Sequence, residues 1–304
     1  EGQLDAAIDD LLAIKRLSRH VAGPRFVIED LVGVDMARRT TGAFGELIAH
    51  EAFTVGHAGT LQEALVPLQG RFPFEQSMDV GERVGFLDTL QRRTSLLWAA
   101  ERPGEKLEMP RIIYRIFDRN LAMRRVNAEY DRLVVAMKLP TPQQRDARLT
   151  ELADQVEQLS ENYDDALDWA AVAIKLLSQE EAERVNTVSN VVVELVMILA
   201  MLDFSRMSSV ADRTEMLEDL ERVAIALGGY RAEHGRYPES LEALVPDLLA
   251  AVPQDIFDTE GGHVRYLLND DRVAIYSVGP NGEDNGGVGF DAFRTGDLGM
   301  AWPR

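Results

Sequence analysis

Cysteine is absent from the 304 residues of this chain, and only five histidines occur. The absence of cysteine excludes disulfide scaffolds, thiolate metal sites and cysteine nucleophiles. His50-Glu51 resembles the start of a zinc-protease motif, but the next histidine is His57, which lies too far along a helix to share the ion. We therefore identify no catalytic residue in the sequence.

Basic residues are few compared with acidic ones, 32 against 51, so the formal net charge is -19. A protein binds phosphate backbones and anionic lipid surfaces through concentrated lysine and arginine, and an acidic surplus repels both. We therefore expect no nucleic-acid partner. The charge is interpreted mainly as a contribution to solubility, with a specific basic partner as the alternative.

Long apolar runs are also lacking. The longest extends from Val191 to Met201, contains Glu194, and is shorter than the roughly 20 residues that span a bilayer. We interpret it as a buried core helix. The sequence starts at Glu1 without an initiator methionine, which leaves a signal peptide and a membrane anchor ahead of it as two open alternatives.

Most of the first 228 residues show a helical pattern, in which apolar residues recur at a spacing of three and four. A break at Gly23-Pro24 separates two such segments and predicts a helical hairpin. Thr60 is expected to cap a short helix that reaches Gln69. The length of the chain suggests two domains, and the first is predicted to be a helical bundle over residues 1–208.

The composition changes after Pro238, where glycine and proline become frequent. The segments 263–268 and 272–277 are predicted strands, joined by a turn at residues 269–271. A helix over residues 209–233 precedes them, and Gly235 can adopt the left-handed conformation that ends it. The expected fold is therefore mostly α, with a helical bundle, a long helix and a small antiparallel sheet, the last two forming an α+β domain over 209–304.

The last third of the chain carries a series of short motifs in a fixed order. They resemble the C-terminal part of the major pseudopilin of type II secretion systems. Ile256 replaces the proline that follows the matching acid in the family, and the family's apolar anchoring helix does not open this chain, so we do not expect a pilus-like fibre. The motifs are Ala211-Asp212-Arg213, Gly235-Arg236-Tyr237-Pro238, Leu241-Glu242-Ala243-Leu244-Val245, Asp255 and Tyr276-Ser277-Val278-Gly279-Pro280-Asn281-Gly282.

The resemblance implies a calcium ion in the loop that follows Ser277. In that family the ion is held by oxygen ligands, including backbone carbonyls, and the matching position here is Ser277. Downstream of it, Asp284 and Asp291 could supply carboxylates. Asn281 stands where an aspartate is usual, and Asp297 is a further candidate. The neighbouring glycines would let backbone carbonyls converge on a hard cation. The alternative is that glycine, asparagine and aspartate simply favour turns here.

These observations favour an interaction protein over an enzyme. The resemblance implies a non-enzymatic, extracytoplasmic scaffold or adaptor in the periplasm or cell envelope, which binds other proteins such as envelope or secretion components. Any membrane attachment would depend on an anchor outside this chain. The alternative is a hydrolase with its site in a groove between the helical domain and the tail.

Overall fold

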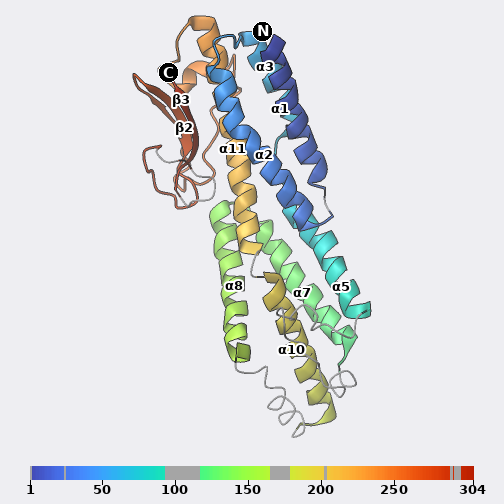
Figure 1. Ribbon diagram of the computed structural model, residues 1–304. Coiled ribbons are helices and arrows are strands. Elements are labelled where there is room, and N and C mark those ends of the chain that lie inside the picture. The colour runs from blue at the N-terminus through green and yellow to red at the C-terminus, as the bar shows by residue number, and fades with distance from the viewer. Residues whose placement is uncertain are drawn as a thin grey trace.

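The computed structural model describes residues 2–23, 25–92, 117–164, 179–201, 204–287, 290 and 296–304. Within these ranges the protein is mostly helical, with a three-stranded antiparallel sheet near the C-terminus. The predicted fold class is therefore confirmed. Figure 1 shows an elongated molecule with both termini at one end, where the sheet lies, and further helices that extend toward the other end.

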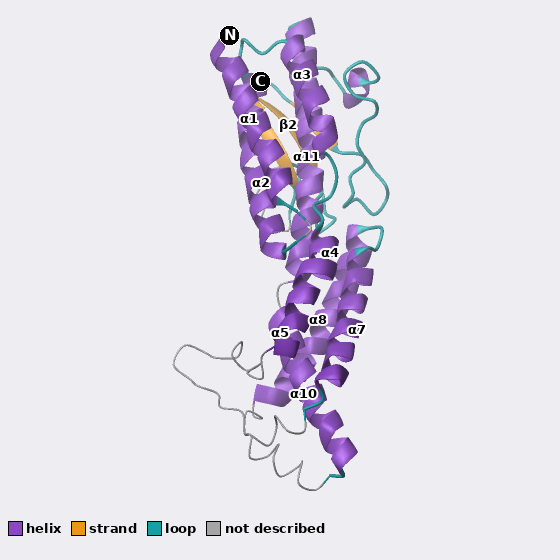
Figure 2. Ribbon diagram, turned by 90° about the vertical axis from the view of Figure 1, so that its right-hand side faces the viewer, coloured by secondary structure: helices purple, strands orange, loops and turns teal. Residues whose placement is uncertain are grey.

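The sheet and the helices beside it form one end of the molecule, which we call the upper lobe. The break at residues 22–26 produces the predicted helical hairpin. This hairpin packs against the long helix that precedes the C-terminal segment 235–304, which we call the tail. Figure 2 shows the sheet behind these helices. The helices are α1 (Gly2–Val21), α2 (Val27–Ala49), α3 (Val55–Leu65) and α11 (Phe204–His234).

The other end, which we call the lower lobe, is a bundle of helices around a separate core. One of its elements is a π-helix, η2, an irregular form in which the helix is widened. The elements between α3 and α11 are the short 3-10 turn η1 (Val66–Leu68), α4 (Phe74–Gln76), η2 (Ser77–Glu82), α5 (Arg83–Arg92), α7 (Arg119–Met137), α8 (Pro142–Asp164) and α10 (Glu181–Met201).

The sheet has the order β1-β2-β3, and all its strands are antiparallel. The side chain of Asn269 accepts hydrogen bonds from the N–H groups of Asp271 and Arg272, which closes the predicted turn between the first two strands. The third strand was not predicted from the sequence. The elements after α11 are the 3-10 turn η4 (Leu241–Leu244), β1 (Arg265–Leu268), β2 (Arg272–Ser277) and β3 (Leu298–Pro303).

The described residues form two separate hydrophobic cores. The upper core joins α1, α2 and α3 to α11 and the sheet, with Phe44 and Ile275 among its buried residues. The lower core includes Tyr130 and Leu149, together with Ala211 near the start of α11. The upper core thus combines residues of the first three helices with residues of α11 and the sheet, whereas the predicted domains divide the chain at residue 208. That division stays a prediction.

Some local expectations need correction. Thr60 does not cap a helix, because its hydroxyl donates to the Gly56 carbonyl within α3. The cap is Thr54, whose hydroxyl accepts the His57 N–H, while the His57 ring accepts the Thr54 N–H. Gly235 does adopt the left-handed conformation after α11, with φ of 71°. Asp118 caps α7, because its side chain accepts the Leu121 N–H.

The close approach of α1 and α2 depends on Gly33. A Cβ atom on Gly33 would lie 2.5 Å from the Ser18 carbonyl oxygen and 2.7 Å from the Ala22 Cβ. We expect Gly33→Ala to lower the free energy of unfolding by about 1–2 kcal/mol, because overpacking outweighs the helix propensity of alanine. Gly42→Ala, on the same helix with open space around it, serves as the control in urea unfolding. A loss of equal size in both variants would contradict this explanation.

Candidate functional site

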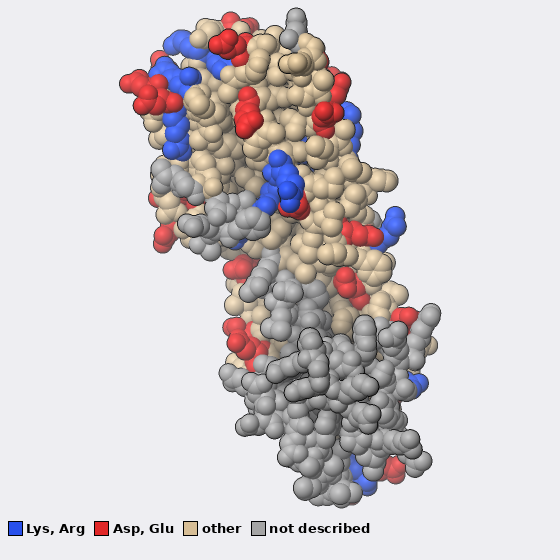
Figure 3. Space-filling model, in the orientation of Figure 1, with Lys and Arg blue, Asp and Glu red and all other residues tan. Residues whose placement is uncertain are grey.

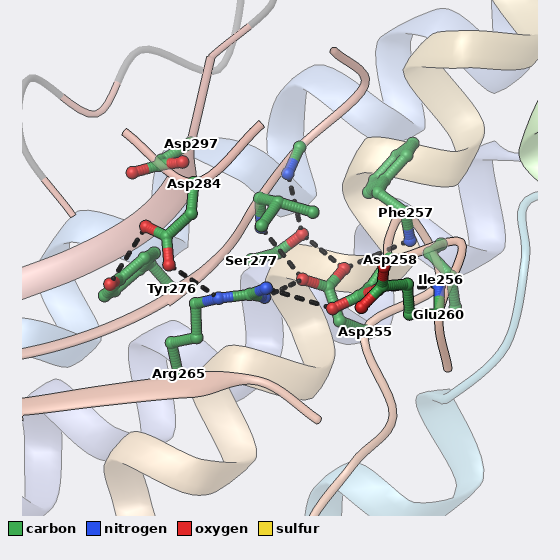
Figure 4. A network of polar contacts seen from close by, with 12 residues as sticks. Asp255, Ile256, Phe257, Asp258, Glu260, Arg265, Tyr276, Ser277, Asp284 and Asp297 are labelled. Atoms are coloured by element: carbon green, nitrogen blue, oxygen red, sulfur yellow. Dashed lines mark hydrogen bonds and ion pairs between the residues drawn. The ribbon is translucent and has the colours of Figure 1, made fainter. Parts of the chain in front are cut away.

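The acidic residues of the tail converge on one arginine. Arg265, the first residue of β1, lies between Asp284 on one side and Asp255 and Asp258 on the other (Figure 4). Its Nε is 2.9 Å from Asp284, its Nη1 3.2 Å from Asp255, and its Nη2 3.0 Å from Asp258. Each carboxylate therefore faces a different nitrogen of the guanidinium group.

Asp255 is the most buried member of this cluster, with 3% of its surface exposed. One carboxylate oxygen accepts hydrogen bonds from the Ser277 hydroxyl at 2.6 Å and the Phe257 N–H at 3.1 Å. The other accepts the Val278 N–H at 2.8 Å. Asp255 thus attaches the turn that comes after it to the end of strand β2. Arg265 compensates the negative charge of Asp255.

The other two acids act at the rim of the cluster. Asp258 accepts the Glu260 N–H, and this bond, together with Arg265, holds the pKa of Asp258 below its ordinary value. Asp284 accepts the Gly286 N–H at 2.9 Å and the Tyr276 hydroxyl at 3.3 Å. Both carboxylates therefore organise the turns in which they lie.

The loop between β2 and β3 is also held from its far end. Asp297, the further calcium candidate, is buried and accepts the N–H groups of Asn285 at 3.1 Å and Gly287 at 2.7 Å. Its carboxylate therefore satisfies backbone donors, as an aspartate in a turn commonly does. This geometry corresponds to the turn-forming alternative at Asp297.

The structure describes two of the three predicted calcium ligands. The Ser277 hydroxyl donates to Asp255, and the Asp284 carboxylate contacts Arg265 and the Tyr276 hydroxyl. Asp291 lies outside the described residues. Within the described ranges, no three histidine, cysteine or acidic residues form a metal-binding group. The calcium site stays a prediction.

Sequence reasoning missed Arg265. The motif comparison singled out Asp255 and Ser277, but nothing in the spacing places a residue of the preceding strand beside Asp255. The register of the sheet does so, because Arg265 pairs with Tyr276 on the neighbouring strand. The only signal in the sequence was an arginine at the start of a predicted strand, near several acids.

A groove lies where the two lobes meet. It has a volume of about 550 Å³ and is bordered by the first turns of α8, the start of α11 and two tail loops. The Gln143 side chain donates to the carbonyl of Phe257 at 3.0 Å, which attaches α8 to the tail beside the groove. The lining residues are Pro142, Gln143, Asp146, Ala147, Ser208, Ser209, Asp212, Arg213, Phe257, Pro280 and Asn281.

Asp212, the buried acid that lines the groove, contacts arginine side chains through both of its carboxylate oxygens. Asp212 on α11 is 2% exposed, and its Oδ1 lies 2.8 Å from Nε of Arg71 and 2.7 Å from Nη2 of Arg145. Its Oδ2 accepts from Nε of Arg145 at 3.2 Å. Arg71 also donates to the Ser208 hydroxyl oxygen at 2.8 Å. The Asp212 carboxylate is therefore tied to two arginines.

The surface shows no dominant charged patch on the face drawn in Figure 3. There, among the described residues, acidic and basic side chains are scattered between uncharged ones over the upper lobe. The described part of this face offers no concentrated positive surface to an anionic partner. No described helix combines the length and apolar character needed to cross a membrane.

Comparison of the chain with protein-family models, with curated proteins and with solved structures found no significant match.

Proposed function

We propose that this protein is a non-enzymatic, extracytoplasmic scaffold or adaptor that binds another protein at the groove between its two lobes. The observation that carries the proposal is the groove itself. Its lining combines apolar side chains, such as Phe257 and Pro280, with uncharged polar ones, such as Ser209 and Asn281. A surface of this mixed character is typical of protein interfaces.

The alternative function is a hydrolase that uses the same groove. Acid–base catalysis would need a carboxylate or a histidine able to exchange a proton with a substrate. Asp212 is held by Arg71 and Arg145, and the described lining contains no histidine. Asp146 is the one exposed acid among the described residues that line the groove. These features support binding as the function of the groove.

The location and the kind of partner rest on the sequence. The motifs of the last third resemble secretion pseudopilins, so we propose an extracytoplasmic setting and a partner among envelope or secretion components. The chain's net charge of -19 also favours a partner with a basic surface over an anionic one.

Ala147→Trp tests the proposed interface. Ala147 is an exposed residue of α8 that lines the groove, so a tryptophan there fills the groove without disturbing a core. We expect the variant to lose, by about tenfold or more, a partner that the unmodified protein captures from an envelope fraction by crosslinking, since the variant removes the space that the partner needs. Quantitative mass spectrometry of the captured proteins gives the ratio.

Ala7→Trp is the matched control, because Ala7 is an exposed alanine on α1 and does not line the groove. It is expected to keep the partner. Equal capture by the unmodified protein and by both variants would mean that the groove is not the binding surface.

A further inference from the structure

We propose that a buried cluster of charged side chains between α1 and α11, which we call the clasp, makes the attachment of α1 to α11 sensitive to pH. The clasp holds α1 most firmly when Glu218 carries a proton, and it loosens as the pH rises above neutrality. Its members are Lys15 and Arg19 on α1 and Glu218 and Glu221 on α11. None of these residues lines the groove, so the inference does not depend on the proposed function.

Two carboxylates of α11 face one ammonium group of α1. The Nζ atom of Lys15 lies 2.7 Å from Oε2 of Glu221 and 3.7 Å from Oε1 of Glu218. The other carboxylate oxygen of Glu218 contacts the guanidinium group of Arg19. Lys15 therefore attracts Glu221 more strongly than Glu218, because the attraction between opposite charges falls with distance.

Helix α2 adds to this difference between the two acids. The hydroxyl group of Thr41 donates a hydrogen bond to Oε1 of Glu221, and the Nζ atom of Lys15 lies over the ring of Phe44 at 5.9 Å from its centre. Lys15 and Glu221 are 2% and 1% exposed. Each oxygen of Glu221 thus has its own close partner, and a proton on Glu218 leaves the pair of Lys15 and Glu221 intact.

Little solvent reaches Glu218. Its side chain is 12% exposed and borders a cavity of about 10 Å³, which is close to the space that one water molecule needs. Arg222 borders the same cavity and pairs with Asp219 at 3.5 Å. The side chains that α3 and η1 bring to the cavity are uncharged. They are Leu65, Leu68 and Gln69.

The burial of Glu218 sets the direction of the pH response. Burial raises the pKa of Glu218 from 4.5 to about 7; Lys15 and Arg19 oppose the rise, and Glu221 adds to it. The folded state then binds more protons than the unfolded state. Its gain in stability is present below pH 4.5 and is lost as the pH rises through about 7. Because the partners of Glu218 belong to α1, the loss should be seen in α1.

Hydrogen exchange of the backbone N–H groups of α1, followed by mass spectrometry, tests the clasp. Protection factors, which correct for the intrinsic effect of pH on exchange, are compared at about pH 5.5 and about pH 8, on either side of the folded pKa of about 7. We expect the protection of α1 in the unmodified protein to fall by about tenfold or more. In Glu218→Gln, which cannot titrate at this position, the fall should be less than about fivefold.

Glu239→Gln is the matched control, because the side chain of Glu239 is 92% exposed and lies outside the clasp. It should keep the pH response of the unmodified protein. Helix α7, which belongs to the lower core, is the internal reference and should lose less protection than α1. An equal fall in α1 and α7, or an equal fall in the unmodified protein and Glu218→Gln, would overturn the proposal.

A direct titration provides the second measurement. NMR of the side-chain carboxyl carbons, labelled in glutamate only, leaves aspartates such as Asp30 silent. We expect one glutamate carbon to titrate with a midpoint near 7 and its signal to be missing from Glu218→Gln. If no glutamate of the unmodified protein had a midpoint above about 6, the proposal would be overturned, whether or not the variant folds.

Discussion

Asp212→Ala is expected to lower the free energy of unfolding by about 3–5 kcal/mol, which is the usual cost of removing one partner from a buried ion pair. The substitution leaves Arg145, which is 7% exposed, without its carboxylate, and also removes the Asp212 contact of Arg71. These contacts join α8 and the segment before α4 to α11, at the junction of the two lobes. Urea unfolding followed by circular dichroism measures the loss.

Asp35→Ala provides the control for this experiment. Asp35 forms an exposed pair with Arg39 one turn along α2, at 2.6 Å. Exposed pairs of this kind contribute only about 0.3–0.5 kcal/mol. If the loss in Asp212→Ala were as small as in Asp35→Ala, the arginine pairs of Asp212 would not stabilise the junction.

Asp30→Asn is expected to stabilise the protein at pH 7.5 by about 2–3 kcal/mol. Asp30 lies on α2 and is fully buried. Burial raises the pKa of its carboxyl group from 3.8 to about 6, and the charges of Glu75 and Glu29 add to the rise. The Ser77 hydroxyl opposes the rise, but it also donates to the Gly23 carbonyl at 3.4 Å, so it offsets only a part.

The pH dependence of this prediction has a defined sign. A carboxyl group whose pKa is higher in the folded state contributes stability below pH 4, and this contribution is lost as the pH rises through about 6. A difference of one unit between folded and unfolded pKa values corresponds to about 1.4 kcal/mol. Asparagine has no such dependence, so the two proteins should differ little at pH 4 and most above pH 6.

Urea unfolding at pH 4, 5, 6 and 7.5, values chosen about the folded pKa of roughly 6, measures the difference. Asp35→Asn, an exposed position on the same helix, should change stability by less than about 0.5 kcal/mol throughout. Equal stability of Asp30→Asn and the unmodified protein at pH 7.5 would show that Asp30 is not ionised at a cost in the folded state.

Most of the described helices could be predicted because their patterns are local. Leu4, Ile8 and Leu12 recur at helical spacing and are all buried in the structure. The hairpin of β1 and β2 was predicted for a similar reason, since alternating residues flank a turn at Asn269. β3 was missed because its three buried apolar residues, Leu298, Met300 and Trp302, form a strand only by pairing with β2.

The candidate site was less accessible to sequence reasoning. Asp255 and Ser277 were recognisable as members of motifs and Asp284 as a nearby acid, but their partners come from other segments. The motif alone suggested an external cation, and the structure provides Arg265 in contact with the acids. The groove likewise combines α8, α11 and tail loops that are separated by many residues along the chain.

The sequence by itself determined the fold class: helical spacing over the first two-thirds, a capped long helix and a small sheet, each specified by neighbours a few residues apart. Only the tertiary structure decided that α1, α2 and α3 pack with the tail, and that Asp212 meets Arg71 and Arg145. The physical reason is that burial and ion pairing depend on which faces meet. That choice is made by the packing of all the elements together, and no local pattern encodes it.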